Sequence, residues 1–109
     1  MQGKKSYQDY QKLAIEDIKY ISEFTVFSMP TYDIYTQSRE AYELLAFDGV
    51  YPRRLIPQEI EQLGTLNCAM FDLIPLLEEA YTYRPKLIKH IRSFNENVTN
   101  MVQLYNMEK

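Results

Sequence analysis

The sequence predicts an all-α fold, an antiparallel four-helix bundle that forms one domain over residues 1–109. Three observations lead to this prediction. Apolar side chains recur at steps of three and four residues, which is the spacing of one face of an α-helix. Prolines and glycine divide the periodic segments, and helices joined by short connections pack antiparallel. With 46% hydrophobic and 25% charged residues, the chain has the composition of one globular domain.

The first predicted helix spans residues 5–28. One of its faces carries charges of alternating sign at steps of four, three and four: Lys12, Glu16, Lys19 and Glu23. The opposite face is apolar and contains Tyr10, Ala14, Ile18, Ile21 and Phe24. A helix with one charged and one apolar face packs its apolar face against other helices. Pro30 ends this helix, because the residue before a proline is displaced from helical geometry.

The second predicted helix lies between Thr31 and Gly49. Thr31 has the side chain of an N-cap residue, and Asp33 places a negative charge in the first turn, where the helix dipole favours it. The buried line of this helix consists of Ile34, Ala41 and Leu45. Gly49 follows the periodic segment and is typical of a left-handed C-terminal stop.

The third predicted helix begins at Pro57, since proline suits the first turn of a helix. Its central stretch, residues 66–77, is mostly apolar, but it is shorter than the roughly 20 residues of a membrane span and it contains Asp72. The stretch therefore predicts a buried bundle helix. Pro75 removes a helical hydrogen bond and collides with the carbonyl group of Phe71, so we expect the helix to be kinked or broken near Pro75.

Two polar side chains of the third helix need separate interpretation. Asn67 lies on the buried line, where an asparagine fixes the register or oligomeric state of a bundle, or else contacts a ligand. Cys68 is interpreted as a small core residue.

The fourth predicted helix begins at Pro85 and has the most regular pattern in the chain. Its apolar residues step by four and three, as in a coiled-coil seam. They are Leu87, Ile91, Phe94, Val98, Met101 and Tyr105. This seam and the 10 tyrosines of the chain offer more apolar surface than four helices need to bury, so the sequence is also compatible with a homodimer.

Composition argues against several classes of function. A net charge of −3 disfavours nucleic-acid binding, which needs a basic surface. The chain has 1 histidine, so a metal site with several histidine ligands is impossible, and neither a glycine-rich phosphate loop nor a hydrolase motif occurs. We therefore expect no metal, no cofactor and no enzymatic activity.

The expected location is the cytoplasm. The chain has 1 cysteine and therefore no internal disulfide, so nothing requires an oxidising compartment. The N-terminal stretch MQGKKSYQDYQK lacks the apolar core of a secretion signal. No segment predicts insertion in a membrane.

A short motif occurs at the start of the fourth helix. Arg84 and His90 are separated by five residues in RPKLIKH. This motif resembles the arginine-to-histidine motif of the HEPN ribonucleases, all-α proteins in which it lies late in the bundle. The resemblance implies an RNA-cleaving site assembled across a dimer, or an inactive relative of such an enzyme. The alternative interpretation is that both side chains are solvated at the start of the helix.

The loop VYPRRLI between the second and third helices is the candidate site for a protein partner. Tyrosine and arginine are enriched at binding hot spots because they combine large contact area with directed hydrogen bonds. The candidate contact residues are Tyr51, Arg53, Arg54 and Leu55. The two arginines, beside the positive N-terminus of the third helix, are also compatible with a nucleotide or another small anion. The alternative is a loop packed over the bundle end with two solvated arginines.

The charge distribution has two interpretations. Residues 31–48 and 58–84 are acidic, whereas residues 86–109 are basic. The bundle could complement its own charges, or the acidic helices could steer a basic partner. We expect a non-enzymatic, acidic helical protein that binds and occludes a protein partner, as an adaptor, inhibitor or immunity-type protein does. The HEPN-like ribonuclease and the anion-binding bundle are the alternatives.

Overall fold

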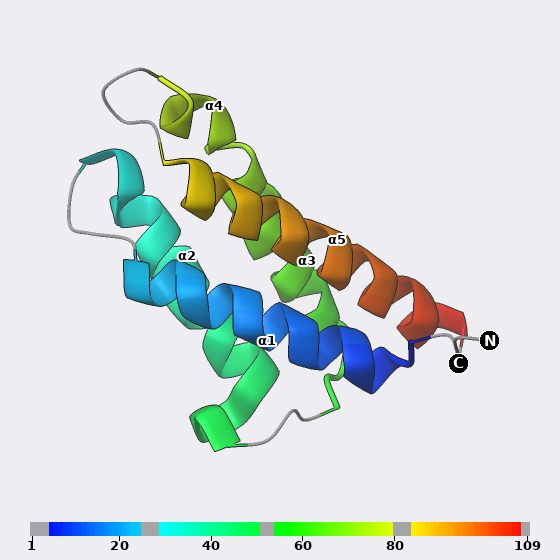
Figure 1. Cartoon of the computed structure of the whole chain (residues 1–109). Helices are drawn as coiled ribbons and strands as arrows, with labels where there is room; N and C mark the ends of the chain where they lie inside the picture. Colours follow the sequence, from blue (N-terminus) through cyan, green and yellow to red (C-terminus); the bar gives the residue numbers. More distant parts are fainter. Residues whose placement is uncertain (1–4, 25–28, 51–53, 80–83, 108–109) are drawn as a thin grey trace.

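Four helical segments pack side by side in the computed structural model, which describes residues 5–24, 29–50, 54–79 and 84–107 (Figure 1). In chain order the elements are α1 (Tyr7–Phe24), α2 (Met29–Val50), α3 (Pro57–Phe71), α4 (Ile74–Leu77) and α5 (Pro85–Met107). The predicted four-helix bundle is confirmed, with α3 and α4 as two parts of the third helix. None of the helices in the described ranges has the length and apolar character needed to cross a membrane.

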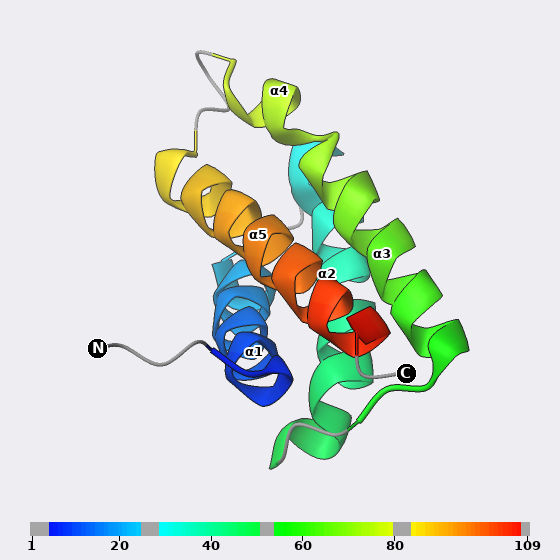
Figure 2. The ribbon, with the colours of Figure 1, turned by 90° about the vertical axis from the view of Figure 1, so that its right-hand side faces the viewer.

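Each long helix has two neighbours in the bundle. α1 packs against α2 and α5, and α3 packs against α2 and α5, with the most extensive contact between α1 and α5. These two helices run antiparallel (Figures 1 and 2). The rings of Tyr7 and Tyr105 are 5.9 Å apart at one end of the pair, whereas Asp17 contacts His90 further along.

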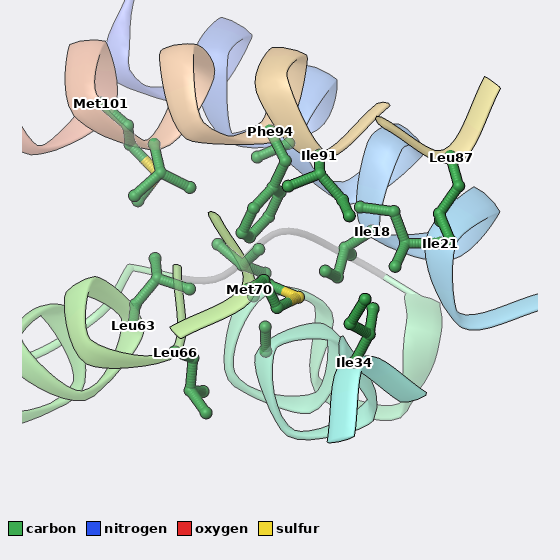
Figure 3. Packing of buried hydrophobic residues seen from close by; sticks show 14 of the residues in the cluster. Ile18, Ile21, Ile34, Leu63, Leu66, Met70, Leu87, Ile91, Phe94 and Met101 are labelled. Carbon is green, nitrogen blue, oxygen red and sulfur yellow. The ribbon is translucent and has the colours of Figure 1, made fainter. Parts of the chain in front are cut away.

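The hydrophobic core lies between the four long helices (Figure 3). Ile18 of α1, Ile34 of α2, Met70 of α3 and Phe94 of α5 are all 0% exposed. The predicted seam of α5 is confirmed, since every one of its six residues is buried. Full burial of such a side chain contributes about 1.5–3 kcal/mol, more than the ~0–1 kcal/mol of an exposed ion pair. Apolar packing therefore holds the helices together.

The first turn of α1 is closed by a reciprocal pair of hydrogen bonds. The backbone N–H of Ser6 donates to Asp9 Oδ2 at 2.9 Å, and the backbone N–H of Asp9 donates to Ser6 Oγ at 3.2 Å. This arrangement satisfies N–H groups that have no partner within the helix. The bond from the Ser6 backbone also lowers the pKa of Asp9 below its ordinary value of 3.8. The helix begins at Tyr7 rather than at residue 5, and its predicted end at residue 28 lies outside the described residues.

The boundaries of α2 differ from the prediction. The helix begins at Met29, so Thr31 lies within the first turn and is not the N-cap residue. Pro30 fits this first turn because its missing N–H would have no helical partner there. The helix also continues through Gly49 to Val50, so the predicted stop at Gly49 is wrong. A glycine costs a helix only about 1 kcal/mol relative to alanine, which the packing of a long helix can outweigh.

The predicted break at Pro75 is confirmed. α3 ends at Phe71, a turn follows, and Pro75 lies in the first turn of α4. The third helix is bent by 35° as a result. Its predicted start is also confirmed, because Pro57 is the first residue of α3 and the N–H of Ile56 donates to Glu59 Oε1 at 3.0 Å.

The apolar stretch 66–77 is buried on one side only. Met70 and Leu77 are 0% exposed, whereas Phe71 and Leu76 are 36% and 45% exposed. Cys68 is exposed as well, so its predicted place in the core is wrong. The reason is that α3 packs against α2 and α5 with one side, whereas Cys68 and Phe71, which are three residues apart and share a face of the helix, lie on its exposed side.

Candidate functional site

The predicted partner loop is only partly described. Tyr51 and Arg53 lie outside the described residues, and their contact with a partner stays a prediction. Leu55 is 1% exposed, so it belongs to the core and offers no side-chain surface to a partner. The N–H of Leu55 also donates to Tyr7 Oη at 3.4 Å, which ties the loop to the start of α1.

Arg54 is exposed, but it contacts the bundle rather than projecting from it. Its guanidinium carbon lies 4.6 Å from the ring centroid of Tyr7 and 5.0 Å from that of Tyr105. Both distances are within the range of a cation–π interaction. The N–H of Ile56 at the start of α3 is already bound by Glu59. The anion-binding hypothesis therefore gains no support from the described part of the loop.

A cluster of polar side chains lies between α1 and α5, centred on Asp17. The Asp17 side chain is 11% exposed, and its carboxylate accepts hydrogen bonds from side chains of α5. Ser93 Oγ donates to Oδ2 at 2.7 Å, and Asn97 Nδ2 donates to the same oxygen at 3.0 Å. His90 Nδ1 lies 2.9 Å from Oδ1. A buried carboxylate needs such partners because burial removes its hydration.

His90 is held on two sides. Asp17 fixes its Nδ1, and the ring of Tyr20 stacks on the imidazole with centroids 3.9 Å apart and an interplanar angle of 26°. The His90 side chain is 31% exposed, so it reaches solvent at the edge of the α1–α5 contact. The interpretation of His90 as a merely solvated residue at the helix start is therefore wrong.

An imidazole beside a carboxylate is suited to proton transfer. The carboxylate favours a proton on Nδ1 and leaves Nε2 as the acceptor, as in hydrolases where an aspartate orients a histidine. Arg84 is exposed and precedes the first residue of α5, about 9 Å along the helix from His90. The contacts of His90 with Asp17 and Tyr20 are both contacts with α1. Among the described residues no group of three His, Cys, Asp or Glu could hold a metal ion.

Sequence reasoning missed this cluster, although a signal was present. His90, Ser93 and Asn97 step by three and four along α5, parallel to its apolar seam. Asp17 lies between the charged and the apolar faces of α1. A second periodic line of polar residues beside a buried seam indicates a polar contact between helices.

A second candidate site lies where the third helix is broken. We call it the helix-break surface. A hollow of about 240 Å³ there is lined by Phe71, Asp72, Ile74, Pro75, Glu78 and Arg92. Ile74 is 3% exposed, whereas the other five lining residues are exposed. Leu76, beside the hollow in sequence, is 45% exposed.

Arg92 of α5 contacts both chemical parts of this surface. Its guanidinium carbon lies 6.0 Å from the ring centroid of Phe71, and Nη2 lies 3.4 Å from Glu78 Oε2. Both members of the ion pair are half exposed, so solvent screens their attraction and the pair contributes little to stability. The surface thus combines accessible apolar side chains with charged groups at their edge.

Asn67 contributes to the contact between α3 and α5. Its Nδ2 donates to Asn95 Oδ1 at 2.8 Å, and the Asn67 side chain is buried. The Asn67 Oδ1 atom is also buried and has no hydrogen-bond partner among the described residues, so the two interpretations of Asn67, as a residue that fixes the register and as a ligand contact, both stay predictions. Comparison of the chain with known protein families, with curated proteins and with solved structures gives no match. The geometry of the described side chains is therefore the basis for a proposed function.

Proposed function

We propose that this chain is a non-enzymatic helical protein of the cytoplasm that binds and occludes a protein partner through the helix-break surface. The supporting observation is the exposure of Phe71, which lines the hollow and is 36% exposed, together with that of Leu76 in α4, which is 45% exposed. Protein-binding surfaces combine an apolar centre with a polar rim, and aromatic residues and arginine are enriched in them. A homodimer stays a further prediction.

The exposed part of Phe71 is large enough to matter for binding. A phenylalanine that is 36% exposed presents about 70 Å² of apolar surface. Burying this area against a partner contributes about 2 kcal/mol. Loss of the ring should therefore weaken binding about 30-fold.

Affinity capture from the native host tests the proposal. The bait is the full chain, either unchanged or with Phe71→Ser and Leu76→Ser. A matched control replaces Ile56 and Met107 by serine, because these apolar residues are 54% and 78% exposed elsewhere on the molecule. We expect the unchanged chain and the control to retain the same partner, and the helix-break variant to lose it. Retention by both variants, or capture of no partner, would contradict the proposal.

The contact between Asp17 and His90 favours a second candidate function, a HEPN-like ribonuclease or an inactive relative of one. A histidine oriented by a carboxylate can take up a proton from a ribose hydroxyl group. In such an enzyme His90 and Arg84 would act in cleavage.

An RNA cleavage assay separates this candidate from the first. His90→Ala should abolish cleavage if the protein is a ribonuclease, whereas partner binding should survive. A contaminating nuclease would cut equally in both preparations. Absence of cleavage by the unchanged protein would rule out an active ribonuclease. The proposed partner-binding function would then stand, and of the second candidate only the inactive relative would be left.

A further inference from the structure

We infer that the partner segment bound at the helix-break surface is basic: a helical segment of a protein with lysine or arginine side chains flanking its apolar residues. This inference rests on the proposed function and specifies the chemistry of the partner. The observation that carries it is the arrangement of charge around the hollow.

The carboxylates bracket the apolar part of the surface. Asp72 lies just before α4, Glu78 follows directly after its last residue, and Glu79 comes next. All three side chains are exposed. Along the chain, Phe71 directly precedes Asp72, and Leu76 lies between Asp72 and Glu78. An apolar segment that covers the hollow must therefore pass between carboxylates.

The local charges do not cancel. Of the six residues that line the hollow, Arg92 alone is basic, and its recorded ion pair is with Glu78 at 3.4 Å. Asp72 is therefore the carboxylate in excess among these six residues. Beyond the hollow, Glu79 adds a carboxylate after α4, and the exposed Arg84 lies at the same end of α4, where its backbone N–H donates to the carbonyl oxygen of Leu77 at 3.1 Å. The lining of the hollow consequently carries an excess of one negative charge around an apolar centre.

This excess selects the partner by its charge. Positive side chains that approach the rim are attracted, whereas acidic segments and phosphate groups are repelled. Rim charges act on association rate and specificity more than on the final affinity, which comes from the apolar centre. A basic amphipathic segment satisfies both parts of the surface.

Two designed helical peptides provide the probe. They share one leucine face, and the polar face carries lysine in one peptide and glutamate in the other. Binding to the full chain is measured by fluorescence anisotropy. We expect the lysine peptide to bind, the glutamate peptide not to bind, and Phe71→Ser to weaken the lysine peptide at least tenfold.

Charge-neutralising variants locate the interaction. Asp72→Asn with Glu79→Gln should weaken binding of the lysine peptide about tenfold. Glu16→Gln with Glu23→Gln changes the net charge equally on the exposed face of α1 and should leave binding unchanged. An equal loss in both variants would show attraction to overall charge and overturn the inference.

The remaining outcomes separate this inference from the proposed function. Binding of the glutamate peptide, or of neither peptide, overturns the inference. If the capture experiment still shows a partner that depends on Phe71, the proposed function stands and only the basic character of the partner is wrong. Preferential binding of the lysine peptide, lost in the variant at Asp72 and Glu79, supports the inference.

Discussion

Replacing Asp17 by alanine tests whether the polar cluster holds α1 against α5. The substitution removes the acceptor for three side chains of α5, among them Ser93 at 2.7 Å and Asn97 at 3.0 Å. Ser93 and His90 are partly exposed and can bind water instead. Asn97 is 9% exposed, so its Nδ2 loses a partner that water cannot easily replace.

The expected cost follows from these environments. A hydrogen bond to a charged group contributes about 1.5–3 kcal/mol, and an unsatisfied buried donor costs about 1–3 kcal/mol. Removing Asp17 also relieves its own desolvation, which offsets part of the loss. We therefore expect Asp17→Ala to lower the free energy of unfolding by about 3 kcal/mol, a large share of the ~5–15 kcal/mol of a typical domain.

Urea denaturation followed by circular dichroism measures this change. Asp72→Ala is the matched control, because an exposed carboxylate should change stability by less than about 0.5 kcal/mol. A double-mutant cycle with Asn97→Ala should show a coupling energy of about 1–2 kcal/mol with Asp17. If Asp17→Ala costs no more than Asp72→Ala, the hydrogen bonds of the cluster do not stabilise the bundle and the reasoning is refuted.

Three further predictions concern stability. Phe94→Ala should destabilise the protein by about 3–5 kcal/mol because Phe94 is 0% exposed, whereas Phe71→Ala should cost less than Phe94→Ala because Phe71 is 36% exposed; equal costs in urea denaturation would contradict the assigned core. Arg54→Ala should lower the melting temperature by about 4 °C through loss of contact with two tyrosine rings, and an unchanged value would argue against these contacts. Because the Ser6 backbone lowers the pKa of Asp9, its carboxylate stabilises α1 above pH 3.8 and loses this effect as the pH falls through the lowered pKa. Asp9→Asn should therefore be less stable than the unchanged protein at neutral pH, and the difference should vanish in acid.

The elements of the fold were predictable where one physical signal acted alone. The seam of α5 has a regular apolar step and no competing feature, and all its residues are buried. Pro75 interrupts a helix that would otherwise continue, because it lacks a backbone N–H and collides with the preceding turn. The structure has the break just before it, with α3 ending at Phe71 and α4 beginning at Ile74. Pro30, by contrast, is compatible with the end of one helix and with the first turn of the next, so periodicity could not fix the start of α2 at Met29.

The candidate sites were less predictable because they depend on how the helices are placed against one another. Asp17 lies 73 to 80 residues from His90 and Asn97, and the alternation of polar and apolar residues gives a face but not a register between two helices. The exposure of Phe71 likewise depends on which sides of α3 face α2 and α5. Leu55 resembled a loop residue, but it is 1% exposed and packs in the hydrophobic core.

The pairing of α1 with α5 also affects how the protein is made. Roughly 80 residues separate Phe24 from Met107, and a ribosome adds about 5–20 residues per second. The nascent α1 therefore waits roughly 4–16 s before its main packing partner has been synthesised. During this interval α1 has α2 as a neighbour but lacks the cover that α5 provides, and Asp17 has none of its partners on α5. The apolar face that α1 turns toward α5 is therefore covered only after the last helix of the bundle has been made.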